Sequence, residues 1–275
     1  MTRSLTSVPT APTSAPTPAA APDSPTSPDP WVELRRHTPA RIALGRAGGS
    51  LPTAELLRFG AAHAQARDAV LVPLDAAALV KALQAQGWAT CQVQSCASDR
   101  AAYLRRPDWG RQLDAASTAA LQASAEGPVD LAIVLGDGLS AVALQRHAGP
   151  LLAALRPLLA PGLRLAPLVI ATQARVALAD AVGALLQARL VLMLLGERPG
   201  LSSPDSLGAY LTYQPRIGRS DAERNCVSNI RPDGLAPAIA AQRLAWLLNE
   251  SLRRRLSGVA LKDDSATALL SDAPP

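Results

Sequence analysis

Three short runs of mainly hydrophobic residues mark the second half of the chain, and each one ends in a polar turn. The runs cover residues 129–135, 165–171 and 190–195. Strands that read as nearly continuous apolar runs are typical of parallel sheets, because helices cover such sheets on both faces. Helical patterns at 140–159 and 177–187 separate the three runs. We therefore predict an α/β fold with a Rossmann-like parallel sheet flanked by helices.

The hydrophobic pattern before this region predicts a helix-rich N-terminal portion with one strand. Helices are expected at 52–67, 75–86, 99–105 and 109–123, and the alternation over 89–94 predicts the strand. A further amphipathic helix is expected from Pro237 to Leu256, where leucines form one stripe.

The two ends of the chain are expected to lie outside the packed structure. Residues 1–30 hold eight prolines and few large apolar side chains, which predicts a disordered tail. The predicted organisation is a tail at 1–30, a helix-rich portion at 31–125, an α/β portion at 126–264 and a frayed tail at 265–275.

The stretch 196–234 differs from the rest of the chain in composition. It is rich in Gly, Pro, Ser, Asp, Asn and Arg and contains Tyr210 and Tyr213. Such a stretch has low helix and strand propensity, so we expect a long ordered loop. Ligands of open α/β sheets bind beyond the carboxyl ends of the strands. The segments 136–140, 173–176 and 196 onward follow three such strands, so a ligand or partner surface is expected there.

Composition excludes several classes of function. The net charge is +5, but the basic residues are almost all arginine and are not interleaved with aromatic side chains, so nucleic-acid binding is not expected. The three cysteines form no CxxC pair and the three histidines are far apart, so no metal ligands are expected. The apolar runs are too short to span a bilayer and no secretory signal opens the chain, so we expect a cytoplasmic protein.

No catalytic set can be assembled from the spacing of the residues. Arg224 lies two residues before Cys226 and favours a lowered thiol pKa there, but no base can be identified beside this thiol. The turn at 136–140 lacks the GxGxxG spacing of dinucleotide-binding proteins. A site-like loop without catalytic residues predicts a chain that holds a ligand for chemistry performed by a partner.

Several segments resemble one known family, the small (light) subunit of ethanolamine ammonia-lyase. The main one is GERPGLSSPDSLGAYLTYQPRIGRSDAERNCVSNIRPDGL, and the others are ARIALGRAG, SLPTAELLRF, DRAAYLRRPDWGR, IVLGDGLSAVALQRHA, RVALAD and RRRLSGVALKD. The resemblance spans about residues 31–263 and omits the Pro-rich tail. It implies a lyase that converts ethanolamine to acetaldehyde and ammonia by a radical mechanism with adenosylcobalamin. In that family the large subunit carries the catalytic residues, and the small subunit closes over the cobalamin.

The resemblance also implies specific residues and partners. Val176 in RVALAD, Glu197 in GERPG and Cys226 in RNCVSN match the cobalamin contacts of the family, which makes 126–264 the cobalamin-binding portion. The implied partner is the large subunit, in a hetero-oligomer with about six copies of each, free or in a bacterial microcompartment. His147 is not part of a DxHxxG motif, so the cofactor is expected to keep its dimethylbenzimidazole on cobalt. The alternative is a non-enzymatic α/β binding or scaffold module that recognises a nucleotide or a protein.

Overall fold

A computed structural model describes residues 26–265 of the chain. The chain divides into two compact units, Met1–Arg58 and Phe59–Pro275. In the first unit the described residues form a short 3-10 helix, Val32–His37, and Ser27 pairs with Arg46 through two backbone hydrogen bonds. Most of the predicted N-terminal tail and nearly all of the predicted C-terminal tail lie outside the described residues.

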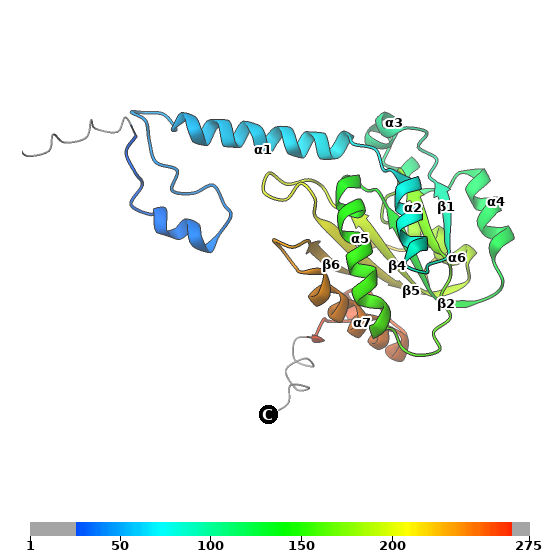
Figure 1. The fold of residues 1–275 in the computed structure, drawn as a ribbon. Coiled ribbons are helices and arrows are strands. Elements are labelled where there is room, and N and C mark those ends of the chain that lie inside the picture. The colour runs from blue at the N-terminus through cyan, green and yellow to red at the C-terminus, as the bar shows by residue number, and fades with distance from the viewer. Residues whose placement is uncertain (1–25, 266–275) are drawn as a thin grey trace, which may run out of the picture. The chain divides into compact units, whose positions relative to one another are not determined.

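A six-stranded sheet forms the centre of the second unit, with the order β1-β3-β2-β4-β5-β6 (Figure 1). The strands are β1 (Thr90–Gln94), β2 (Val129–Gly136), β3 (Leu168–Thr172), β4 (Ala188–Gly196), β5 (Leu207–Tyr213) and β6 (Arg224–Ile230). The first four in sequence pair in parallel, whereas β5 and β6 are antiparallel to their neighbours. The predicted α/β class is confirmed, and the sheet is mixed because two antiparallel strands extend its parallel part.

The described residues 26–265 contain seven α-helices. They are α1 (Thr53–Leu71), α2 (Ala76–Ala85), α3 (Arg100–Arg105), α4 (Ala115–Ser124), α5 (Ala141–Leu155), α6 (Leu178–Leu185) and α7 (Pro237–Arg254). Short polar side chains accept a hydrogen bond from the first turn of several helices, as Asp75 and Ser140 do at α2 and α5. The predicted single helix 109–123 is wrong. A 3-10 turn, Trp109–Arg111, comes first, and Asp114 then caps a separate α4.

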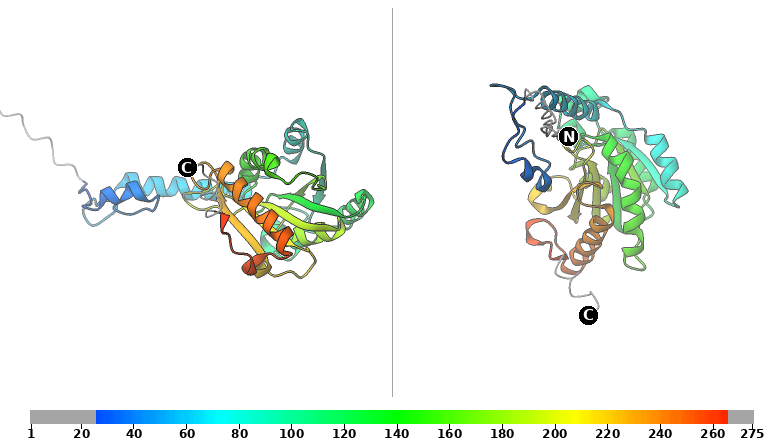
Figure 2. Two further views of the ribbon diagram at one scale, coloured as in Figure 1. Left: turned by 90° about the horizontal axis from the view of Figure 1, so that it is seen from below. Right: turned by 60° about the vertical axis from the view of Figure 1, so that its left-hand side comes forward.

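Helices lie on both faces of the sheet (Figure 2), and a hydrophobic core fills the space on each face. Leu131, Ile133 and Leu135 of β2 belong to the core that contains α2, α5 and α7. The alternate residues Ala132 and Val134 belong to the other core, with α4 and α6. Successive strand residues point to opposite faces, so a strand covered on both faces must be apolar at nearly every position. This explains the continuous hydrophobic runs in the sequence.

The stretch 196–234 is ordered, but it is not the irregular loop expected from its composition. It contains β5 and β6, which form a hairpin on the edge of β4. Leu207, Ala209 and Leu211 point into the α5–α7 core and alternate with residues on the other face. Their alternation supplies the strand signal, which the surrounding Gly, Ser and Asp residues obscure. Among residues 26–265, no helix has the length and apolar character that crossing a membrane requires.

Candidate functional site

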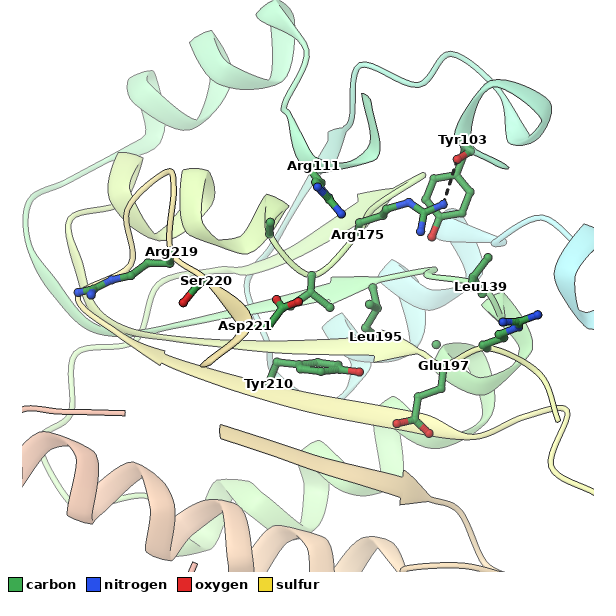
Figure 3. Close-up of a pocket in the computed structure, with 14 residues that line it drawn as sticks. Tyr103, Arg111, Leu139, Arg175, Leu195, Glu197, Tyr210, Arg219, Ser220 and Asp221 are labelled. Carbon is green, nitrogen blue, oxygen red and sulfur yellow. Dashed lines mark hydrogen bonds between the residues drawn. The ribbon is translucent and has the colours of Figure 1, made fainter. Parts of the chain in front are cut away.

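A cavity of about 550 Å³ lies at the carboxyl ends of the central strands (Figure 3). It is lined by Tyr103, Arg111, Leu139, Arg175, Val176, Ala177, Leu195, Gly196, Glu197, Arg198, Tyr210, Arg219, Ser220 and Asp221. These residues come from α3, the 3-10 turn before α4, the turns after β2 and β3, the end of β4, and the hairpin. The structure therefore brings the three strand-end segments of the sequence prediction together around one cavity.

Two backbone segments under the cavity touch directly because glycine occupies both. The N–H of Leu139 donates to the carbonyl oxygen of Gly196 at 2.9 Å. Gly138 has a φ of +57°, and a Cβ there would lie 2.0 Å from that same oxygen. Only glycine combines a left-handed conformation with such a close approach. The pair of glycines fixes the turn after β2 against the end of β4.

A buried carboxylate holds the turn that carries Val176. Asp137 is 2% exposed, and its two carboxylate oxygens accept hydrogen bonds from the N–H groups of Gln173 and Ala174, both at 2.9 Å. The guanidinium of Arg100 lies 3.6 Å away. Burial raises the pKa of Asp137, while these hydrogen bonds and Arg100 act against that rise. The carboxylate thus supports Gln173, whose φ of +54° is unfavourable for a residue with a side chain.

Glu197 connects the end of β4 to the hairpin and also lines the cavity. Its Oε2 accepts hydrogen bonds from the Ser206 hydroxyl and, at 3.2 Å, from the N–H of Asn229. Within the described part of the chain, no hydrogen-bond donor reaches its Oε1. One oxygen of this half-buried carboxylate therefore stabilises the hairpin, and the other lies over Gly208 of β5.

Cys226 lies beside the cavity, although it is not among the residues that line it. It is opposite Tyr210 in the β5–β6 register. Partial desolvation and the negative charge of Glu197 raise the pKa of the Cys226 thiol, and the neighbouring Tyr210 side chain opposes them. The expectation of a lowered pKa is wrong, because Arg224 is neutralised by Asp180 through two bonds of 2.6 Å.

Sequence reasoning missed the aromatic and basic part of the cavity. The Tyr103 ring lies between two guanidinium groups, those of Arg100 and Arg175, each 4.6 Å from its centroid. Burial raises the Tyr103 pKa to about 12, and its hydroxyl donates to the carbonyl of Ala174 at 3.2 Å. The available signals were the scarcity of aromatic residues, which marks Tyr103, and the two family-like segments DRAAYLRRPDWGR and RVALAD, which contain Tyr103, Arg111 and Arg175.

Metal binding is not supported in the described part of the chain. No group of three or more His, Cys, Asp and Glu side chains there could hold a metal ion. His147 is buried on α5, outside the cavity lining, with its Nε2 3.5 Å from a carboxylate oxygen of Asp205.

The chain matches one protein-family model, described as ethanolamine ammonia-lyase light chain (EutC), over residues 28–262. It is 57% identical over 246 residues to the ethanolamine ammonia-lyase small subunit of Ralstonia nicotianae, which covers 88% of this chain and 91% of that protein. It is 55% identical to the same subunit of Azotobacter vinelandii over 254 residues, 91% of this chain and 94% of the relative. The corresponding protein of Xanthomonas campestris is 54% identical over 253 residues, 90% and 93% of the two chains. This chain therefore belongs to the ethanolamine ammonia-lyase light-chain family.

Proposed function

We propose that this chain is the small subunit of an adenosylcobalamin-dependent ethanolamine ammonia-lyase, and that its cavity covers part of the cobalamin. The observation that carries the proposal is the placement of the three expected cofactor residues. Val176 and Glu197 line the same cavity at the ligand-binding edge of the sheet. Cys226 lies opposite Tyr210 in the β5–β6 register, and Tyr210 lines the same cavity.

The size and chemistry of the cavity suit one part of a cobalamin. A corrin has apolar faces and a rim of amide groups, and the lining mixes apolar side chains with scattered polar ones. Cavities of this size enclose a drug-sized ligand. A cobalamin is larger, so a second surface must cover the rest of it. This requirement supports a site shared with a partner, the large subunit.

Each of the three residues has a distinct role in this proposal. Oε1 of Glu197 accepts hydrogen bonds from rim amides or a ribose hydroxyl, Val176 provides apolar contact, and the Cys226 thiol provides a small, polarisable surface. Adenosylcobalamin, when bound, supplies the radical chemistry, and the protein positions and shields it. His147 is buried outside the cavity, which supports a cofactor that keeps its dimethylbenzimidazole on cobalt.

The large subunit is assigned the substrate chemistry, because no acid, base and nucleophile set is assembled around the described cavity. The assembly proposed is a hetero-oligomer with about six copies of each subunit, free in the cytoplasm or inside a bacterial microcompartment. Mass measurement of the purified complex tests this stoichiometry.

Co-expression with the candidate large subunit tests the function. The reconstituted complex is expected to release acetaldehyde and ammonia from ethanolamine only when adenosylcobalamin is present, and the isolated chain is expected to be inactive. Ethanolamine turnover by this chain alone would contradict the assignment of catalysis to the partner. A well-assembled complex that neither binds cobalamin nor turns over ethanolamine would contradict the proposed function.

A further inference from the structure

The charged groups of the cavity do not balance one another. Four arginines and two carboxylates line it: Arg111, Arg175, Arg198, Arg219, Glu197 and Asp221. Arg219 is paired with Glu223, and Asp221 lies 3.4 Å from Arg224. Glu197 accepts its hydrogen bonds from the hairpin. Within residues 26–265, the guanidinium groups of Arg111, Arg175 and Arg198 have no carboxylate within 4 Å.

Arg175 is held firmly, but its hydrogen-bonding capacity is not filled. Its backbone N–H donates to the carbonyl of Gly110 at 2.8 Å, and its Nη2 donates to the carbonyl of Tyr103 at 3.2 Å. Its guanidinium stacks on the Tyr103 ring. Its Nε is buried and finds no acceptor among the residues that the structure describes. A buried N–H without a partner is costly, so the described residues leave Arg175 incompletely satisfied.

Arg111 directly follows Gly110, whose carbonyl accepts the Arg175 backbone bond. A Cβ on Gly110 would lie 3.0 Å from Cγ of Arg175, so the two segments are in close contact. Figure 3 shows the Arg111 and Arg175 side chains starting close together, with the Arg175 guanidinium turned toward Tyr103 and Glu197 farther away. An arginine charge without a carboxylate partner becomes more costly as a ligand displaces water from the cavity, and a bound anion offsets that cost.

The planar donors of arginine match phosphate oxygens better than those of any other side chain. A cobalamin carries one such group, the phosphodiester of its nucleotide loop. We propose that Arg111 and Arg175 bind this phosphodiester and thereby set the direction in which the nucleotide loop leaves the corrin. The inference rests on the proposed function and assigns Arg111 and Arg175 to the phosphodiester of the cobalamin. The acceptor end, at Glu197, then faces the amide rim.

The test compares two ligands and two arginine variants in the complex with the large subunit. Cyanocobalamin carries the nucleotide loop, whereas dicyanocobinamide lacks the loop and its phosphate. Binding of each is measured by equilibrium dialysis with the visible absorption of the corrin. Arg175→Gln and Arg111→Gln are each expected to weaken cyanocobalamin binding by about 10- to 100-fold, the loss typical of one charge-assisted hydrogen bond. Cobinamide binding is expected to change by less than about twofold, because it has no phosphodiester to lose.

Two further variants serve as controls. Arg164→Gln removes an exposed arginine next to Asp130, away from the cavity, and should leave both ligands unaffected. Arg175→Lys keeps the charge but loses the planar fork, so it should retain part of the preference for cyanocobalamin.

Equal loss of both ligands in the arginine variants would overturn the inference, because it would mean that the arginines only shape the cavity. Unchanged cyanocobalamin binding in both variants would overturn it as well. In either case the wild-type complex still binds cobalamin, and the proposed function stands. A wild-type complex that binds neither ligand would instead reject the proposed function, and the inference with it.

Discussion

Two arginine sites in the second unit differ in how completely their donors are used. Arg224 has a side chain only 2% exposed, and it donates two hydrogen bonds of 2.6 Å to Asp180. It also donates to the Thr212 hydroxyl at 3.0 Å and to the carbonyl of Arg219 at 2.9 Å. Arg175, in contrast, has a buried Nε without an acceptor and no carboxylate within ion-pair distance among the described residues.

The difference separates an arginine that stabilises the fold from one that is available to a ligand. Arg224 joins β6 to α6 through Asp180, and its charge is fully compensated by protein groups. The protein already uses the guanidinium donors of Arg224, so none remains for a cofactor. Arg175 and its neighbour Arg111 are positioned by backbone contacts, so their charges remain uncompensated at the cavity. Residue type alone does not distinguish these cases, because arginine supplies nearly every positive charge of this chain.

The largest effect on stability is expected from breaking the buried ion pair between Arg224 and Asp180. Arg224→Met leaves Asp180 buried without its partner, and such a change typically costs about 3–5 kcal/mol of unfolding free energy. Arg175→Gln should cost far less, because no buried carboxylate loses its partner. Urea unfolding of the isolated subunit measures both.

The double variant Arg224→Met/Asp180→Leu sharpens this prediction. It removes both charges, so it should be more stable than Arg224→Met alone. Equal stability of Arg224→Met and Arg175→Gln would show that the two arginine sites are energetically alike, and the comparison would fail.

A second prediction concerns the acceptor end of the cavity. Glu197→Ala should weaken adenosylcobalamin binding by about 1.5–3 kcal/mol, the loss of a charged hydrogen-bond acceptor in a desolvated site. It should also destabilise the hairpin, because Ser206 and Asn229 lose their acceptor. Titration of the reconstituted complex and thermal unfolding of the subunit separate the two effects.

Glu126→Ala is the matched control for this change, since Glu126 is exposed and away from the cavity lining. It should alter both quantities by less than about 0.5 kcal/mol. Unchanged cofactor affinity in an assembled Glu197→Ala complex would exclude Glu197 from the binding site.

The parallel part of the sheet could be predicted from the sequence, whereas its antiparallel extension could not. β2 and β4 are covered on both faces, so nearly every residue is apolar and the signal is continuous. β5 and β6 lie in a stretch with many Gly, Ser and Asp residues, and only every second residue of β5 faces the α5–α7 core. Their formation depends on pairing with β4, which local composition does not encode.

The position of the cavity could also be predicted, but the electrostatics within it could not. Glu197 directly follows β4 and Val176 lies in the turn after β3, so topology places them at the ligand-binding edge. The pKa of Cys226 is raised first by desolvation and then by the charge of Glu197, and the nearby Arg224 charge is paired with Asp180. These partners are distant in sequence, and no spacing rule connects them.

A smaller effect is expected from Asp137→Asn, which weakens the support of the turn before Val176. The amide keeps one acceptor oxygen, so one of the two backbone hydrogen bonds is lost. Removing a charge that burial disfavours offsets part of this loss, and we expect about 1 kcal/mol of destabilisation. Hydrogen exchange at the amides of Gln173 and Ala174 should accelerate. Unchanged exchange at both amides would show that the carboxylate does not hold this turn.

The smallest effect is expected at a third kind of arginine site, on the surface. Asp130 accepts a hydrogen bond from the N–H of Arg164 at 3.0 Å and one from the exposed Arg189 guanidinium at 3.0 Å. These bonds lower the Asp130 pKa, the backbone bond being the larger cause. A carboxyl whose pKa is lower in the folded state adds stability above its unfolded pKa of about 3.9, and this stability is lost as the pH falls. Wild type should therefore exceed Asp130→Asn in stability by at most about 1 kcal/mol at pH 7, and the difference should shrink below about pH 4. Urea unfolding at both pH values measures it. A difference as large as that of Arg224→Met would mean that exposure to solvent does not weaken the pairing of arginines in this protein.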